Sequence, residues 1–289
     1  MMRNYFNIAN YVIGIDCYST EVLDELGEFS YFKTVASSAD FEIVIQPECI
    51  DVPMGKPYYI LNDDNIVSSF YEQEGLYVAV IDEIGKGKLH VTFNSVNETC
   101  IISGPQNSML LRFALWLAFG YFALIRKTIA IHSSAIVYKN QAALFLGESG
   151  TGKSTHTALL QREFPEIKLL NDDSPILRFE NGKIMAYGSP WSGKTACYRQ
   201  TKAEVKAFVR LIQAPYNTLE PLELIDAVAA LFPSMPPEFY RSQQLASSIY
   251  EMLSLILAQT PVYRLYCRPN CAAAQLSFSS IFGNGTARE

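Results

Sequence analysis

The fold is decided by the stretch Gly147-Glu148-Ser149-Gly150-Thr151-Gly152-Lys153-Ser154-Thr155, which matches the phosphate-loop pattern G-x-x-x-x-G-K-[ST] at every specified position. The apolar run 142–146 before it predicts a buried strand, and residues 155–161 after it predict the start of a helix. Glycines in such a turn let backbone N–H groups converge on phosphate oxygens at the N-terminus of the helix. This context disfavours the alternative of a chance Gly/Ser-rich turn.

The same stretch supplies the candidate nucleotide-binding residues. Lys153 would reach the β- and γ-phosphates, and the Ser154 hydroxyl would bind Mg²⁺. The other candidates would hold the phosphates through backbone N–H groups or hydroxyls, and they are Gly147, Ser149, Gly150, Thr151, Gly152 and Thr155. The sequence therefore predicts a site for a nucleotide together with Mg²⁺.

An acidic pair, Asp172-Asp173, follows the loop at the end of another apolar run. Neighbouring side chains at the end of a strand point to different sides, so the two carboxylates would take different roles. One would hold Mg²⁺, and the other would accept the proton of an attacking hydroxyl. The alternative is a solvated turn, because Asn-Asp-Asp-Ser is also good turn chemistry.

Two further segments carry candidate catalytic side chains. His132 precedes the strand that leads into the loop, so it would lie beside the phosphates or orient an aspartate; a purely structural histidine is equally compatible. Lys194 ends a second Gly/Ser-rich segment, Gly188–Lys194, and would stabilise charge on a transferring phosphoryl group. Trp191 in that segment would form a wall of the substrate site, although turns alone explain its Gly and Pro residues. His156 is expected to face outward from the loop helix.

Strands and helices alternate in the second half of the chain, which predicts an α/β nucleotide-binding domain over residues 104–289. Its expected helices cover 107–127, a segment from residue 153, 222–232, 239–258 and 271–282; its expected strands cover 130–137, 142–146, a run ending at residue 170, 176–179, 184–186, 208–212 and 262–266. Residues 1–103 predict a β-rich α+β region, with strands at 11–15, 41–45, 77–81, 89–93 and 99–102.

Charge and composition narrow the classes of partner. The net charge of −6, with no Lys/Arg-rich run, argues against nucleic acid as the main partner.

The cysteines and the N-terminus favour a cytoplasmic protein with reduced thiols. The six cysteines are scattered without metal-ligand spacing, and the N-terminus has no signal-peptide pattern. The apolar segment 109–125 is interrupted by Arg112 and predicts a core helix rather than a membrane span. Association into a homo-oligomer is left open.

Taken together, these motifs resemble the catalytic domain of HPr kinase/phosphorylase and its relatives, a group that shares its fold with phosphoenolpyruvate carboxykinase. The resemblance is carried by the order His132, Gly147–Ser154, Asp172-Asp173 and Gly188–Trp191, within residues 128–200. It implies an α/β P-loop kinase domain, with ATP on the loop.

The resemblance also implies roles for single residues. Mg²⁺ would be held by Ser154 and the acidic pair, with Asp172 as the ligand. One aspartate, Asp173 by preference, would be the general base toward a substrate hydroxyl, assisted by His132. The acceptor would be a serine-type hydroxyl of a protein, peptide or small molecule.

Two departures weigh against HPr as the acceptor and against the reverse phosphorylase reaction. Thr155 stands where HPr kinases have Glu, and Gly188–Lys194 stands where the bifunctional enzymes carry an Arg-Gly-Leu-Gly-Ile type segment. Two other functions stay open at this point. The chain would also fit a carboxykinase-type enzyme that acts on a small molecule, or a non-catalytic nucleotide sensor whose β-rich half carries the output.

Overall fold

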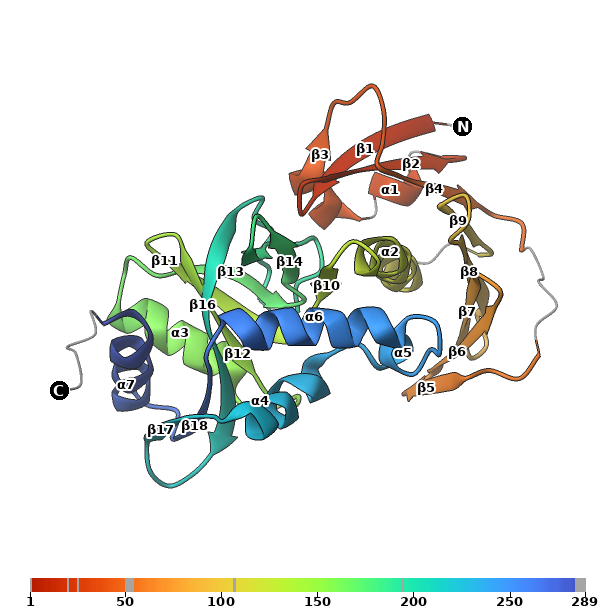
Figure 1. The fold of residues 1–289 in the computed structure, drawn as a ribbon. Coiled ribbons are helices and arrows are strands. Elements are labelled where there is room, and N and C mark those ends of the chain that lie inside the picture. Colours follow the sequence, from red (N-terminus) through yellow and green to blue (C-terminus); the bar gives the residue numbers. More distant parts are fainter. Residues whose placement is uncertain are drawn as a thin grey trace. The chain divides into compact units, whose positions relative to one another are not determined.

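The computed structural model describes residues 2–19, 21–24, 26–49, 55–105, 108–193 and 195–283. The chain divides into two compact units, Met1–Thr128 with Pro237–Ile249, and Ile129–Pro236 with Tyr250–Glu289. Each unit contains a large β-sheet accompanied by helices, so the mixed α/β class expected from the sequence is confirmed (Figure 1).

The first unit is built on a sheet with the strand order β3-β1-β2-β4-β9-β8-β7-β6-β5. The strands are β1 (Met2–Ile8), β2 (Tyr11–Cys17), β3 (Lys33–Thr34), β4 (Phe41–Gln46), β5 (Tyr59–Asp63), β6 (Ile66–Gln73), β7 (Leu76–Glu83), β8 (Gly87–Asn94) and β9 (Thr99–Ser103), and short helices α1 (Glu21–Asp24) and η1 (Gly27–Phe32) precede β3. All five strands predicted in this region are present. Four strands were not predicted: Asn, Asp and Ser interrupt the apolar residues of β1, β5 and β6, and β3 has only two residues.

Helix α2 (Ser108–Leu124) confirms the helix predicted over 107–127, and its aromatic side chains pack on the sheet of the first unit. The ring of Phe122 lies 4.5 Å from that of Phe41, and the ring of Tyr121 lies 5.3 Å from that of Tyr77. The helix therefore groups with the first unit, whereas the sequence-based boundary near residue 103 placed it with the second. No helix in the described part of the chain is long and apolar enough to cross a membrane.

The segment Pro237–Ile249 belongs to the first unit although it follows most of the second in sequence. Phe239, in α5 (Pro237–Tyr240), packs with Tyr121 at a ring distance of 5.2 Å. The hydroxyl of Ser242 and the backbone N–H of Gln243 both donate to the carboxylate of Glu72. These contacts interrupt the helix, so the single helix predicted over 239–258 is wrong: α5 ends at Tyr240 and α6 (Ala246–Gln259) begins after a turn.

The second unit has a mixed sheet with the order β10-β14-β15-β16-β12-β11-β13, and β18 lies beside β16 with β17 on its outer side. The strands are β10 (Thr128–Ala130), β11 (Ser133–Tyr138), β12 (Gln141–Leu146), β13 (Lys168–Asp173), β14 (Ile176–Glu180), β15 (Lys183–Tyr187), β16 (Lys202–Gln213), β17 (Thr218–Pro221) and β18 (Val262–Cys267). The helices are α3 (Lys153–Glu163), α4 (Leu224–Leu231), η2 (Phe232–Ser234), the part of α6 from Tyr250 onward, and α7 (Cys271–Phe282). The strand predicted over 130–137 is split at residues 131–132, whose N–H groups donate to Pro175 O and Ser234 O.

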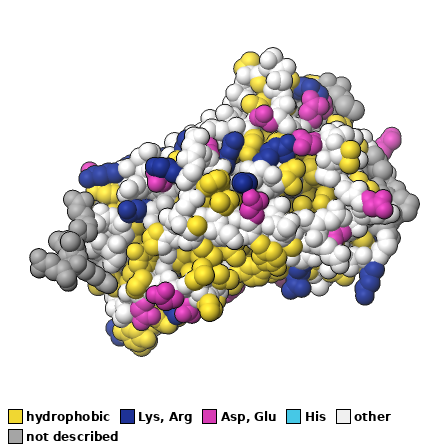
Figure 2. Space-filling view, viewed as in Figure 1, with side chains coloured by type: hydrophobic (Ala, Val, Ile, Leu, Met, Phe, Trp, Pro, Cys, Tyr) yellow, Lys and Arg dark blue, Asp and Glu magenta, His cyan; other side chains and the backbone are white. Residues whose placement is uncertain are grey.

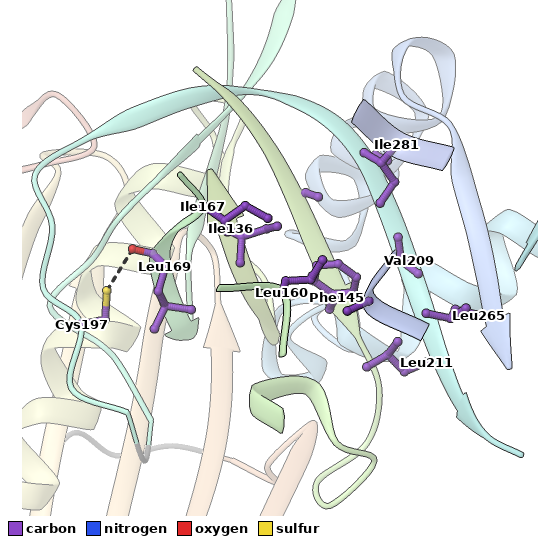
Figure 3. Close-up of a cluster of buried hydrophobic side chains, with 13 residues drawn as sticks. Ile136, Phe145, Leu160, Ile167, Leu169, Cys197, Val209, Leu211, Leu265 and Ile281 are labelled. Carbon is purple, nitrogen blue, oxygen red and sulfur yellow. Dashed lines mark hydrogen bonds between the residues drawn. The ribbon is translucent and has the colours of Figure 1, made fainter. Parts of the chain in front are cut away.

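A buried apolar cluster joins the strands of the second unit to α3 and α7 (Figure 3). Phe145 and Val209 come from the neighbouring parallel strands β12 and β16, and Leu160 and Ile281 come from α3 and α7. Each of these side chains is less than 5% exposed. Burial at about 25 cal/mol per Å² of apolar surface makes this cluster a main source of stability for the unit. It fixes the end of β12 and the start of α3, which is where the glycine-rich loop lies.

Candidate functional site

Strand register brings three separate segments to one edge of the second sheet. Strand β11 runs antiparallel to both β12 and β13, and Ser133 pairs with Leu146 on one side and with Asp173 on the other. The start of β11 therefore meets the ends of its two neighbours. His132 precedes β11, the glycine-rich loop 147–152 follows β12, and the acidic pair ends β13. The structure brings His132, the loop and the two aspartates to one edge of the sheet, and the register explains why.

The glycine-rich loop connects β12 directly to the N-terminus of α3, as predicted. Gly152 lies at the N-cap position with a φ of 100°, a left-handed conformation that favours glycine. No side chain in the described part of the chain caps this helix end. The first backbone N–H groups of a helix lack intrahelical partners, and the helix dipole adds positive potential. The end of the loop is thus suited to bind an anion.

The Lys153 side chain folds back over the loop. Its Nζ donates to Gly147 O at 2.8 Å and to Glu148 O at 3.2 Å. Desolvation lowers the pKa of Lys153, and the carboxylates of Asp173, Asp172 and Glu148 counteract that shift. The ammonium group is held among loop carbonyls and the acidic pair, within the pocket where phosphates would lie.

Ser154 and Asp172 form the polar centre of the site. Ser154 Oγ donates to Asp172 Oδ1 at 3.0 Å, and the Asp172 residue is only 5% exposed. Asp172 Oδ2 is buried and has no hydrogen-bond partner among the described residues. A buried carboxylate oxygen without a partner is costly unless a cation or donor binds it. One hydroxyl and one carboxylate, completed by phosphate and water oxygens, fit Mg²⁺. Within the described ranges, no cluster of three or more His, Cys, Asp or Glu side chains offers a separate metal site.

The backbone of Gly193 approaches the acidic pair closely. Its N–H donates to Asp172 O at 2.7 Å, and Ser192 forms an isolated bridge with Asp173. A Cβ atom at position 193 would lie 2.7 Å from Asp172 O, so only glycine fits there without a shift. The second Gly/Ser-rich segment therefore supports the acidic pair through its backbone.

His132 lies beside the second aspartate. Its Nε2 is 3.7 Å from Asp173 Oδ1, and both side chains are about half-exposed, at 46% and 47%. Desolvation and the charge of Lys153 lower the pKa of His132, and the charge of Asp173 offsets part of that shift. The neutral form of the imidazole is therefore favoured, and its Nε2 lies near the carboxylate without a hydrogen bond in this structure.

These groups line one pocket of about 330 Å³. Nine of the predicted residues line it together with Gly193, and they are His132, Ser149, Gly150, Gly152, Lys153, Ser154, Thr155, Asp172 and Asp173. Two further predicted loop residues, Gly147 and Thr151, are not part of this lining. Lys194, predicted as a catalytic cation, lies outside the described residues. Two other expectations are wrong. Trp191 is 4% exposed and lies in the interior instead of forming a pocket wall, and His156 is 3% exposed instead of facing outward.

One ion pair at the loop was not predicted from the sequence. Arg210, on β16, donates to Glu148 Oε1 at 2.6 Å, and its other nitrogen reaches Ala230 O and Ser234 Oγ. The Arg210 side chain is only 14% exposed. The backbone N–H of His132 donates to Ser234 O, so one polar network ties the loop to the His132 turn. The sequence feature that pointed to this ion pair is the single charged residue, Arg210, within the otherwise apolar run 208–212.

No protein-family model matches the chain, and no curated protein matches it. One solved structure found is similar to part of it. This is the Hpr(Ser) kinase/phosphatase from Coxiella burnetii, with a TM-score of 0.29 and 14% identity over 51% of this chain and 85% of that one.

Proposed function

We propose that this protein is an ATP-dependent phosphotransferase that phosphorylates a serine-type hydroxyl of a protein, peptide or small molecule. The observation that carries the proposal is the contact between Ser154 Oγ and Asp172 Oδ1 at the N-terminus of α3. The buried Asp172 Oδ2, without a partner among the described residues, adds to it. A hydroxyl and a carboxylate at the end of a glycine-rich loop are the protein ligands that a Mg²⁺-bound nucleoside triphosphate requires.

In the proposed reaction the loop amides and Lys153 hold the triphosphate. Phosphate oxygens replace Gly147 O and Glu148 O as the acceptors of the Lys153 ammonium group, which is already beside the site. Ser154 and Asp172 would hold Mg²⁺, which neutralises charge developing on the β–γ bridging oxygen. Positioning and electrostatic stabilisation, rather than covalent chemistry, then supply most of the rate enhancement.

Asp173 is the proposed general base, with His132 as the residue that orients it. The acceptor oxygen forms a bond to the γ-phosphorus, and its proton passes to the Asp173 carboxylate. The bond from the γ-phosphorus to the β–γ bridging oxygen breaks, and ADP leaves with that electron pair. The half-exposed position of Asp173 supports this role, because an incoming hydroxyl must reach the base.

The surface charge supports a protein, peptide or small-molecule acceptor over nucleic acid. The chain has a net charge of −6. On the face shown in Figure 2, Lys and Arg side chains are interspersed with Asp and Glu instead of forming one basic patch. Nucleic-acid binding depends on clustered cations that neutralise phosphates. We propose an acceptor that is recognised through a single hydroxyl.

Thermal unfolding with and without Mg·ATP tests the nucleotide site. Ligand at about 100 times its Kd should add roughly 2.7 kcal/mol to the stability of the wild type. The Lys153→Ala variant should lose this shift, and Arg264→Ala, which removes a cation outside the pocket, should retain it. Absence of a shift in the wild type would overturn the proposal. Phosphotransfer is then followed with γ-labelled ATP and hydroxyl-bearing acceptors.

A further inference from the structure

A second pocket of about 400 Å³ is also lined by the glycine-rich loop, together with residues from the ends of β16 and β18. It shares Gly150, Gly152 and Thr155 with the phosphate pocket, so a molecule lying on the loop can extend from one into the other. The two pockets differ in chemistry. Lys153 and the acidic pair line the first, whereas Leu211 and Cys267 are part of the wall of the second.

We propose that this second pocket holds the base and ribose of the nucleotide whose phosphates lie on the loop, an inference that rests on the proposed function. The γ-phosphate must lie next to Asp173 and the incoming acceptor. The nucleoside therefore leaves the loop at the opposite end, where the shared residues Gly150 and Thr155 lead into the second pocket.

The position of the pocket in the sheet supports a nucleoside. Strands β12, β16 and β18 are parallel neighbours, and the pocket is built where all three end. Ligands of open α/β sheets bind outside the carboxyl ends of parallel strands. Gln213, the last residue of β16, pairs with Cys267, the last residue of β18, and the N–H of Ala214 donates to Cys267 O. The two strand ends are thus joined into one wall.

The side chains of this wall suit a flat, partly polar ring system. Leu211 and Cys267 offer apolar surface, and Arg268 and Gln213 bring hydrogen-bonding groups to the same pocket. Ligand pockets of a few hundred Å³ with apolar walls and a few converging polar groups are typical sites for small molecules. Gln213 Nε2 also donates to Gly150 O at 3.2 Å, which links this wall to the phosphate loop.

Protection of Cys267 from alkylation tests the inference on the intact protein. Iodoacetamide labelling is followed site by site with mass spectrometry, without ligand, with Mg·ATP and with Mg·tripolyphosphate, which lacks a nucleoside. Burial raises the pKa of Cys267, so the labelling is carried out at alkaline pH. At ATP about ten times its Kd, the free fraction is about one in eleven, and the labelling rate of Cys267 should fall about tenfold. Tripolyphosphate should leave that rate unchanged.

Two cysteines outside the pocket serve as labelling controls, and a variant within the pocket tests the contact with the nucleoside. Exposed Cys49 and partly buried Cys271, neither of which lines the pocket, should label at the same rate in all three conditions. Arg268→Ala should raise the Kd for ATP severalfold without changing that for tripolyphosphate, and Arg264→Ala should change neither. The variants are compared at 0.15 M ionic strength, where screening limits long-range charge effects.

Two other outcomes overturn the inference in distinguishable ways. A thermal shift with ATP but unprotected Cys267, or equal protection by tripolyphosphate, would place the nucleoside elsewhere and leave the proposed function intact. Absence of both the thermal shift and the protection would overturn the proposed function and this inference together.

Discussion

At the scale of single residues, two adjacent aspartates occupy different environments. Asp172 is 5% exposed and accepts a hydrogen bond from Ser154, whereas the Asp173 side chain is 47% exposed and lies beside His132. The alternation of side chains along β13 produces this difference, since consecutive residues of a strand point to opposite faces. One carboxylate is therefore buried against Ser154 and the other is open to solvent, a difference that agrees with the proposed roles of Asp172 as a Mg²⁺ ligand and Asp173 as the base.

Neutralising each aspartate separately should give different defects. Asp172→Asn should remove most of the thermal shift with Mg·ATP, because the buried oxygen no longer attracts the cation. Asp173→Asn should retain that shift and lower kcat by about 10²- to 10⁴-fold, the usual contribution of a general base. Calorimetric ATP titration and a phosphotransfer assay measure the two effects. Equal loss of binding in both variants would contradict the division of roles.

His156 makes the stability of the second unit pH-dependent. Its Nε2 lies 3.0 Å from Ser277 Oγ, and burial lowers the pKa of His156 from 6.5 to about 4. The unfolded chain therefore binds this proton more readily than the folded one. The stabilisation is complete above pH 6.5 and is lost as the pH falls toward 4, with a total on the order of 3 kcal/mol. In denaturant titrations between these pH values, His156→Gln should show a smaller pH dependence than the wild type.

At the scale of elements, the local sequence pattern was sufficient to predict most helices and strands of the second unit. The strand ending at Leu146, the helix from Lys153 and the closing helix α7 lie where apolar periodicity and turn residues predicted them. The acidic pair ends β13 as expected. These features depend on neighbours in sequence, which is why a sequence alone could predict them.

The features that could not be predicted depend on contacts between distant residues. The break between α5 and α6 is stabilised by Glu72, which lies far away in the sequence. Arg210 forms an ion pair with Glu148 because β12 and β16 are parallel neighbours, with Leu146 opposite Arg210. Burial of Trp191 likewise follows from tertiary packing. Contacts between residues that are far apart in the chain cannot be inferred from their sequence. The loop and the acidic pair of the candidate site could therefore be predicted, whereas the ion pair between Arg210 and Glu148 could not.

The close approach between residue 193 and β13 predicts a sensitive position outside the loop. In Gly193→Ala, the new Cβ would lie 2.7 Å from Asp172 O and 3.2 Å from Asp173 Cβ. Forcing these atoms apart should cost about 1–3 kcal/mol and displace the acidic pair, which weakens Mg·ATP binding. Gly27→Ala, where a Cβ meets nothing within 4 Å, is the matched control. Urea denaturation measures the free energy of unfolding of both variants, and ATP titration measures their affinity for Mg·ATP. Wild-type values of both quantities in Gly193→Ala would contradict the expectation.

At the scale of the whole molecule, the chain forms two units of which the first is discontinuous. The segment Pro237–Ile249 returns to the first unit after the chain has formed much of the second. Phe239 is 2% exposed and contacts Trp116 and Tyr121 of α2. Tyr58 also donates to Glu238 O at 2.7 Å. The first unit therefore depends on a short segment remote in sequence.

Removing one aromatic ring from that segment should destabilise the first unit selectively. Phe239→Ala leaves a cavity against α2 and should cost about 3–5 kcal/mol. Hydrogen exchange followed by mass spectrometry should show lost protection in α2 and β7, while peptides from α3 and β13 still gain protection with Mg·ATP. Ile225→Ala, at a position that is 85% exposed, provides a surface control. Loss of the nucleotide response in Phe239→Ala would show that the two units do not act separately.

The return of residues 237–249 also orders events during biosynthesis. Trp116 and Tyr121 are synthesised before residues 129–236, whereas Phe239, which packs against both rings, is synthesised after them. Domains usually fold as units from the N-terminus onward during translation. Here the aromatic side chains of α2 lack their partner Phe239 until residues 237–249 have been synthesised, so the first unit can complete its packing only after most of the second unit has been made.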